Sequence, residues 1–346
     1  MASDTSKQQG RPGPEMGHRP PLLSVRELGV ALQTRGGNLQ LTQNISFEVG
    51  AGERVGIVGE SGCGKTVTGL ALLRLLPARS MQVSGKILLD GTDLLRLPGR
   101  QMRAIRGRQV AMIFQEPMSA LDPVFTIGQQ IGEAIRAHFP VGAREARERA
   151  VDVLDRVGIP LPQRRHDEYP HQLSGGMRQR AMIAIALACQ PRLLIADEPT
   201  TALDVTIQAQ IIELLVKLSS EAGTALLFIT HDLGVVAETC ERVLTMYAGQ
   251  VVEDAPVEDV LVRPRHPYTS ALMRSLPNLS VPKSVLPSIP GRVPNALAMP
   301  AGCRFAPRCA HARPACGRAQ DALPVGADHR VRCARFDELE LPGTAA

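Results

Sequence analysis

Alternating apolar and polar positions near the N-terminus predict two paired strands. Residues 22–32 and 39–49 both alternate apolar and polar side chains, the pattern of strands that bury one face. The intervening Arg35-Gly36-Gly37-Asn38 favours a turn. We therefore expect an antiparallel pair at the start of the folded region. The preceding residues, 1–21, are polar and rich in proline, and we expect them to form a disordered leader.

Beyond this pair, short apolar runs alternate with segments of helical periodicity. The helical segments include residues 126–188 and 208–220. Strands separated by helices in this way form a mainly parallel, buried sheet. The chain is thus predicted to be an α/β protein. The apolar runs that predict strands are residues 54–58, 86–89, 110–114, 193–196, 224–230 and 243–247.

One predicted strand leads into a glycine-rich loop that is typical of phosphate binding. Residues 54–58 are followed by Gly59-Glu60-Ser61-Gly62-Cys63-Gly64-Lys65-Thr66, of the form G-x-x-x-x-G-K-[ST], and then by an apolar helical pattern. The glycines let successive N–H groups point at phosphate oxygens, and the start of the helix adds positive potential. Lys65 is expected to reach the β- and γ-phosphates and Thr66 to ligate Mg²⁺. The strand and helix on either side disfavour the alternative of a plain glycine-rich turn.

A second predicted strand ends in two acidic residues. The apolar run at residues 193–196 continues into Asp197 and Glu198. A nucleotide loop needs a carboxylate at the end of a neighbouring strand to hold Mg²⁺, and Asp197 fits that role. Glu198, one residue farther, can accept a proton from the attacking water. Alone such a strand is weak support, but together with the loop it indicates nucleotide hydrolysis.

Composition and charge indicate which kinds of partner the chain can bind. The 346 residues carry a net charge of +5 without a long basic run, and the aromatic side chains are three Tyr, seven Phe and no Trp. We therefore expect no nucleic-acid partner. No apolar run is long enough to span a membrane, and the N-terminus does not have the pattern of a signal peptide. A cytosolic protein is expected, with any role at a membrane played through partners.

Further segments resemble those of ATP-binding cassette (ABC) proteins. Residues 173–180, Leu-Ser-Gly-Gly-Met-Arg-Gln-Arg, match the family's signature sequence, and Gln115 resembles its Q-loop glutamine. Residues 202–204, Ala-Leu-Asp, resemble the D-loop, and His231 resembles the switch histidine. The resemblance covers roughly residues 22–255. It implies a P-loop NTPase of the ABC type, with a RecA-like core, an antiparallel β subdomain and a helical signature subdomain at about residues 116–190.

The resemblance also implies the roles of these residues. Ser174, Gly175 and Gly176 would reach the γ-phosphate of ATP bound to a second ATPase subunit, so that ATP joins the two subunits. His231 would contact the γ-phosphate, and Gln115 would ligate Mg²⁺ and take part in catalysis. Asp204 would lie at the nucleotide. Taken singly, Ser174 could be an ordinary helix cap, His231 a capping or core residue, and Gln115 polar surface.

One position departs from the family pattern. Many ABC domains stack adenine on an aromatic residue near the end of the first strand, where this chain has Leu32. Loss of that stacking costs about 1 kcal/mol. We therefore expect looser ATP binding or weaker selection against GTP, and we expect Leu32→Phe to tighten ATP binding.

The C-terminal residues, 256–346, resemble the tail of ATPases that serve oligopeptide and dipeptide importers. The resemblance runs from Arg265-His266-Pro267-Tyr268-Thr269 through a segment rich in cysteine. In that family, four tail cysteines bind a 4Fe-4S cluster in some members. The chemistry of four thiolates also permits zinc, and plain packing is a third alternative. Wide spacing without a C-x-x-C pair favours the cluster. The cysteines are Cys303, Cys309, Cys316 and Cys333.

The resemblance to both regions implies an ATP-hydrolysis-coupled translocase. Its expected substrate is a peptide or a related small solute such as nickel, and its expected ligands are ATP and Mg²⁺. The implied partners are a second, homologous ATPase, two membrane permeases and an extracytoplasmic solute-binding protein. The chain would then lie peripherally at the cytoplasmic face of the inner membrane. A soluble ABC ATPase acting on nucleic acid or ribosomes and an ABC exporter subunit are the alternatives.

Overall fold

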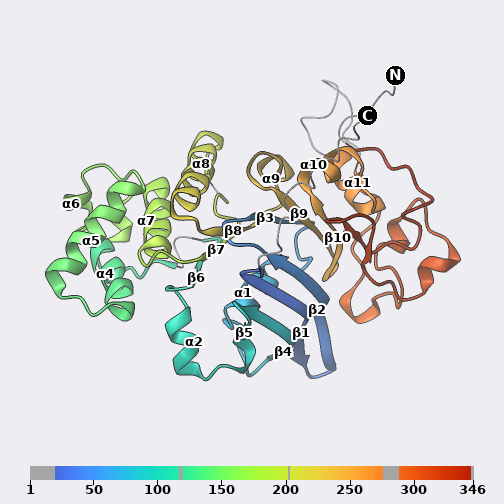
Figure 1. Ribbon diagram of the computed structural model, residues 1–346, viewed down its shortest axis with the longest axis horizontal. Coiled ribbons are helices and arrows are strands. Elements are labelled where there is room, and N and C mark those ends of the chain that lie inside the picture. Colours follow the sequence, from blue (N-terminus) through green and yellow to red (C-terminus); the bar gives the residue numbers. More distant parts are fainter. Residues whose placement is uncertain (1–19, 117–119, 202, 276–287, 344–346) are drawn as a thin grey trace, which may run out of the picture.

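The computed structural model describes residues 20–116, 120–201, 203–275 and 288–343 (Figure 1). Most of the expected leader, residues 1–19, therefore lies outside the described residues, as do residues 117–119 of the segment that follows Gln115 and Ala202 of the D-loop. Within the described ranges, no helix is both long and apolar enough to cross a bilayer.

The predicted N-terminal strand pair is confirmed and belongs to a four-stranded antiparallel sheet. β1 (Leu23–Thr34) pairs with β2 (Gly37–Val49), and both strands run closer to the turn than the alternation predicted. β4 (Met81–Leu89) pairs with the other edge of β1 and with the short β5 (Thr92–Asp93). The strand order is β2-β1-β4-β5.

The second sheet is mainly parallel, as the alternation of strands and helices predicted. Its strand order is β11-β12-β10-β9-β3-β8-β7-β6, and the five strands from β9 to β6 run parallel. The remaining strands pair antiparallel at one edge. The strands are β3 (Arg54–Val58), β6 (Val110–Ile113), β7 (Leu193–Asp197), β8 (Ala225–Ile229), β9 (Arg242–Tyr247), β10 (Gln250–Pro256), β11 (Leu323–Pro324) and β12 (Arg330–Val331).

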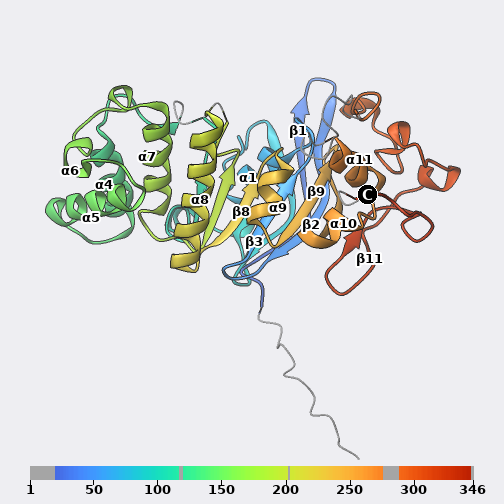
Figure 2. The same ribbon diagram turned by 90° about the horizontal axis from the view of Figure 1, so that it is seen from above.

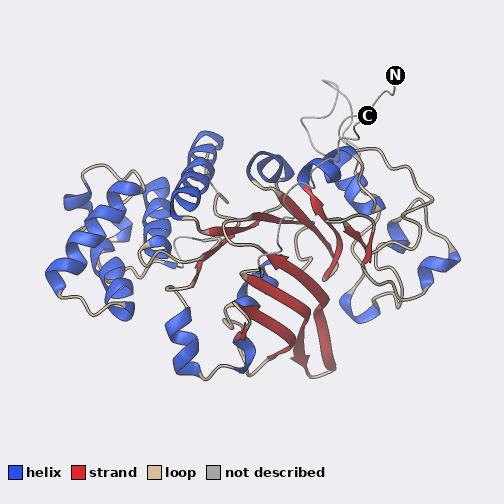
Figure 3. Cartoon of the chain, viewed as in Figure 1, coloured by secondary structure: helices blue, strands red, loops and turns tan. Residues whose placement is uncertain are grey.

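Helices separate and cover the two sheets (Figure 3). α1 (Lys65–Leu72) lies between them, and its Leu72 shares a core with Leu28 of β1 and Ile57 of β3. On the opposite face of the central sheet, α8 (Val205–Ala222) and α9 (Leu233–Thr239) pack on side chains such as Phe228. The other helices of the body are α2 (Gly99–Ile105), α10 (Val257–Val262) and α11 (Pro267–Arg274).

A helical subdomain projects from the β6–β7 side of the body, at the end opposite the C-terminal residues (Figure 1 and Figure 2). It contains α4 (Ile127–His138), α5 (Ala143–Arg156), α6 (Pro162–Arg165) and α7 (Gly175–Leu187).

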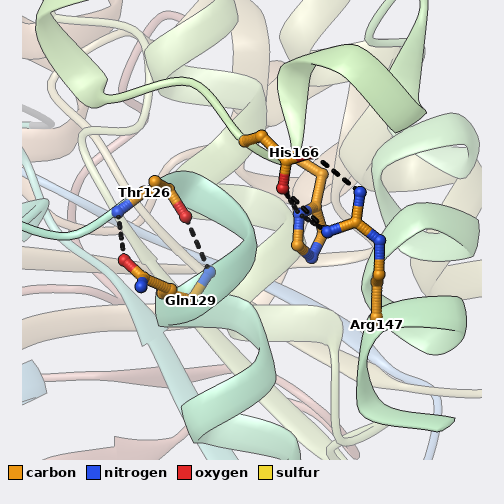
Figure 4. Close-up of polar contacts among 5 residues, drawn as sticks. Thr126, Gln129, Arg147 and His166 are labelled. Atoms are coloured by element: carbon orange, nitrogen blue, oxygen red, sulfur yellow. Dashed lines mark hydrogen bonds and ion pairs between the residues drawn. The ribbon is translucent and has the colours of Figure 1, made fainter. Parts of the chain in front are cut away.

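Local contacts explain how this subdomain is held together. Thr126 and Gln129 exchange side-chain-to-backbone hydrogen bonds and so cap α4 (Figure 4). The His166 ring packs on α4 at Gly128, where a Cβ atom would lie 2.2 Å from the ring, and only glycine leaves room for it. Arg147 of α5 contacts His166 Nδ1 at 3.0 Å and therefore links α5 to the same point.

The C-terminal residues continue the central sheet. In β12, Val331 pairs with Glu253 of β10. The Glu253 side chain is fully buried and accepts hydrogen bonds from the backbone N–H groups of Arg265 and His266, at 2.6 and 3.0 Å. It also contacts His329 Nε2 at 2.9 Å. One buried carboxylate thus ties two segments of the C-terminal region to the edge of the sheet.

Candidate functional site

The phosphate-binding loop leaves β3 and ends at the first residue of α1. Gly59, Gly62 and Gly64 all have positive φ angles, of 153°, 77° and 103°. At Gly59 a Cβ atom would stand 2.2 Å from the carbonyl oxygen of Met246, so a side chain cannot be accommodated. Gly64 is the N-cap of α1, whose first residue is Lys65. The positive end of the helix therefore faces the loop, as the motif predicted.

Lys65 is buried within the loop that it follows. Only 5% of the residue is exposed, and its ammonium donates hydrogen bonds to the carbonyl oxygens of Gly59 and Glu60 at 2.7 and 3.3 Å. These carbonyl groups hold the Lys65 ammonium against the phosphate-binding loop. The loop opens on a cavity of about 490 Å³, a size suited to a small-molecule ligand. The cavity is lined by Gln40, Leu41, Ser61, Gly62, Gly64, Lys65, Thr66, Val67, Gln115, Glu198, His231, Ala248, Val293, Pro294, Ala296 and Met299.

Thr66 lines the cavity, and behind it the Thr66 side chain contacts Asp197, which is not among the described lining residues. The Thr66 hydroxyl donates to Asp197 Oδ1 at 3.1 Å, which brings together two oxygens that the sequence assigned to Mg²⁺. Asp197 is only 1% exposed, at the end of β7. Its burial raises the pKa of the carboxyl to about 6, and the nearby Glu198 charge also raises it, whereas the Thr66 hydrogen bond and Lys65 lower it.

Glu198 stands at the centre of a cluster of polar side chains. Gln115 Nε2 and the Thr201 hydroxyl both donate to Glu198 Oε2 at 3.1 Å, and His231 Nδ1 lies 3.4 Å from Oε1. The backbone of Glu198 has a φ of 44°, an unfavourable angle for a residue with a side chain. Its N–H donates to the carbonyl oxygen of Ile229 in β8. The three residues predicted to be catalytic are therefore brought together, and Thr201, which the sequence reasoning did not single out, contacts the same carboxylate.

Other predicted site residues do not reach the cavity. The Ser174 hydroxyl accepts a hydrogen bond from the N–H of Met177 at 3.3 Å and caps α7, in the helical subdomain. Neither Ser174 nor Gly175 and Gly176 line the cavity. Asp204 is exposed at the start of α8, and its side chain makes no capping hydrogen bond. Leu32 is half-buried and is not among the described residues that line the cavity.

The four C-terminal cysteines surround one small pocket. Cys303, Cys309, Cys316 and Cys333 all line it, together with His266, Phe305 and His311. Burial raises the pKa of Cys303 and Cys309, and raises that of Cys333 to about 11. In the part of the chain that the structure describes, no group of three or more His, Cys, Asp or Glu side chains is placed to hold one metal ion.

Two family profiles match separate regions of the chain. The sequence profile of the family described as "ABC transporter" matches residues 42–201. A second profile, "Oligopeptide/dipeptide transporter, C-terminal region", matches residues 252–316. A probable peptide ABC transporter ATP-binding protein of Sinorhizobium fredii is 52% identical over 92% of this chain and 96% of its own. The chain belongs to the ABC transporter family. A putative peptide import ATP-binding protein of Brucella melitensis is 50% identical to this ABC protein, over 93% of this chain and 99% of its own.

Solved structures place the fold of this ABC protein among ATP-binding cassettes. A dimeric post-hydrolysis state of the cassette MJ0796, bound to ADP and Pi, has a TM-score of 0.61 and 26% identity. The match covers 68% of this chain and 98% of that one. The cbiO1 protein of Clostridium perfringens matches with a TM-score of 0.58 and 28% identity, over 69% of this chain and 90% of its own.

The C-terminal region of the ABC protein also contacts the phosphate-binding loop, which the sequence did not predict. Arg308 donates from both Nη atoms to the Glu60 carboxylate, at 2.7 and 3.0 Å, and the Tyr268 hydroxyl accepts from the Glu60 N–H at 2.9 Å. Arg308 also lies over the rings of Tyr247 and Phe305. The position of Arg308 beside Cys309 carried no signal for this contact, because 248 residues separate it from Glu60.

Proposed function

We propose that this chain is the ATP-hydrolysing subunit of an ABC importer for peptides or a related small solute such as nickel. One observation carries the proposal. A single cavity brings the phosphate-binding loop together with Gln115, Glu198 and His231, in a chain whose tail matches that of oligopeptide and dipeptide transporters. The names of the relatives support peptide import as the process that hydrolysis drives.

Within the cavity, each residue has a role that follows from its chemistry. The loop N–H groups and Lys65 bind the phosphates of the substrate, ATP. Thr66, Asp197 and Gln115 supply oxygen ligands of the kind that Mg²⁺ prefers, and the ion would neutralise phosphate charge. Glu198 accepts the proton of the attacking water, with His231 beside it at the γ-phosphate end. The hydrogen bonds from Gln115 and Thr201 hold the Glu198 carboxylate in position.

The position of the signature sequence supports a site shared between two ATPase subunits. Ser174, Gly175 and Gly176 present a hydroxyl and helix N–H donors outside the cavity of their own chain. We propose that they complete the ATP site of a second ATPase, with Asp204 at the same interface. ATP would close the pair and hydrolysis would reopen it. The dimeric state of the MJ0796 cassette supports this arrangement.

The proposed machine contains further subunits. Two membrane permeases and an extracytoplasmic solute-binding protein would complete it, with this chain at the cytoplasmic face of the inner membrane. Co-purification from membranes tests this directly. We expect two polytopic membrane proteins to remain with the full-length chain. Recovery with ribosomes or nucleic acid, and without membrane proteins, would instead identify a soluble ABC ATPase.

For the cysteine pocket we propose a 4Fe-4S cluster, with zinc as the alternative. A single zinc ion draws four sulfurs to about 2.3 Å from one centre. A four-iron cluster takes one thiolate at each iron, so its ligands surround a larger body. Four cysteines around one pocket support a shared site, and their wide spacing without a C-x-x-C pair favours the cluster. When bound, it would cross-link the tail and release the thiol protons.

Anaerobic purification distinguishes the two metals. We expect a brown protein with absorbance near 400 nm and about four irons per chain. Replacing Cys316 with Ser should remove the colour, whereas replacing the distant buried Cys189 should not. A colourless protein with one zinc per chain would exclude the cluster.

A further inference from the structure

The lining of the nucleotide cavity has two chemically different parts. One part is polar or charged and comprises Ser61, Lys65, Thr66, Gln115, Glu198 and His231. The other part is apolar and comprises Leu41 of β2 with Val293, Pro294, Ala296 and Met299 of the C-terminal region. A nucleotide whose triphosphate is bound by the polar part has this apolar part available for its base. Leu32, at the position where many ABC domains carry the aromatic residue that stacks on adenine, is not among the described residues that line the cavity.

We infer that Val293, Pro294, Ala296 and Met299 form a wall that receives the nucleotide base and so replaces the missing aromatic contact. The inference rests on the proposed binding of ATP to this cavity. A flat base between Leu41 and the Met299 side chain would gain dispersion contacts on both faces and leave water. The expected ligand is a purine nucleoside triphosphate, and the wall increases its affinity only through contacts with the base.

The residues of the wall are held in place by packing in the absence of a ligand. Val293 and Met299 pack against an apolar cluster that contains Tyr247, Tyr268 and Phe305. The short 3-10 helix Ala296–Ala298 packs on β2, and its N-cap Asn295 accepts a hydrogen bond from the N–H of Leu297 at 3.0 Å. A side chain that is already held loses little conformational freedom when the base binds.

Arg308 joins the wall to the phosphate-binding loop. Its Nε donates to the carbonyl oxygen of Pro290 at 2.9 Å and one Nη to that of Ile289 at 3.2 Å, just before the wall begins. The same guanidinium binds the Glu60 carboxylate in the loop. One side chain therefore connects the segment that leads into the wall with the phosphate-binding loop.

The test compares ligands that differ in the base. The affinities of Mg-ATP and of inorganic tripolyphosphate are measured by calorimetry on the full-length chain. Met299→Ala should weaken ATP roughly tenfold, because most of one wall side chain is removed. It should leave tripolyphosphate unchanged. Val293→Ala, a smaller truncation, gives the same comparison if Met299→Ala does not fold. Leu297→Ala is the matched control, since Leu297 is 78% exposed on the same short helix.

Two results would overturn the inference. One is an unchanged ATP affinity in a folded Met299→Ala or Val293→Ala chain. The other is an equal loss for ATP and tripolyphosphate, which would mean that the substitution acts through the phosphate-binding loop. Lys65→Ala separates this failure from failure of the proposed site. It should weaken both ligands, and an unchanged affinity for both would refute ATP binding at this cavity, with or without the wall.

Discussion

Replacing Asp197 with Asn should stabilise the protein in the absence of nucleotide, by an amount that grows as the pH rises above 3.8 and is complete above about pH 6. Asp197 is 1% exposed, and its burial raises the pKa of the carboxyl from 3.8 to about 6. Ionising this carboxyl therefore costs the folded protein free energy that the unfolded chain does not lose. Asn keeps the size of the side chain and an oxygen for the Thr66 hydroxyl, but it cannot ionise.

The sign and size of the effect follow from the two pKa values. Below pH 3.8 the carboxyl is protonated in both states, so ionisation has no effect on stability. As the pH rises from 3.8 to about 6, the carboxyl ionises in the unfolded chain before it does so in the folded protein, and the free energy of unfolding falls. A difference of about two in pKa corresponds to a loss of about 3 kcal/mol above pH 7. For a chain of this length, that loss lowers the melting temperature by about 4 °C.

Thermal unfolding of both proteins at pH 5 and pH 8, without nucleotide or Mg²⁺, measures this difference. The Asn variant should melt about 4 °C above the natural protein at pH 8, and the gain should shrink at pH 5. Asp152→Asn, on the exposed face of α5, is a matched control that should change little at either pH. A gain of the same size at both pH values, or a loss at pH 8, would show that burial of the Asp197 charge is not the cause.

Three further substitutions test the catalytic cluster and the contacts of the loop. Glu198→Gln should lower ATP turnover at least ~100-fold while ATP binding is retained, since the amide cannot accept a proton; turnover and affinity are measured on the same sample. Arg308→Ala should destabilise the protein by about 3 kcal/mol in urea unfolding, because it leaves the Glu60 carboxylate without its bidentate partner. Tyr268→Phe should cost about 1–3 kcal/mol, since the Glu60 N–H then has no acceptor.

Each of these expectations has an outcome that contradicts it. Turnover within about tenfold of the natural protein would remove Glu198 from the role of base. Arg144→Ala removes an exposed ion pair on α5 and should cost less than about 1 kcal/mol. An equally small loss for Arg308→Ala would mean that the contact with Glu60 contributes little. A Tyr268→Phe chain as stable as the natural protein would show that water satisfies the Glu60 N–H instead.

The sequence by itself determined the parts of this protein that depend on neighbours along the chain. The form of residues 59–66 requires a loop with free N–H groups, because glycines stand where φ must be positive and a helix begins at Lys65. Period-two alternation predicted the β1–β2 pair, and buried runs predicted the parallel strands. Asp197 and Glu198 were predicted to lie near the phosphate-binding loop, because the ends of parallel strands share one edge of a sheet.

Only the tertiary structure decided which distant segments close the nucleotide cavity. Arg308 contacts Glu60, Met299 lines the same cavity as Leu41, and β12 pairs with β10 at the edge of the central sheet. That pairing involves two residues in each strand, too few to leave a periodic pattern in the sequence. Residues joined only by long-range packing carry no local signal of their meeting, which is why the tail's place in the nucleotide site emerged only from the folded chain.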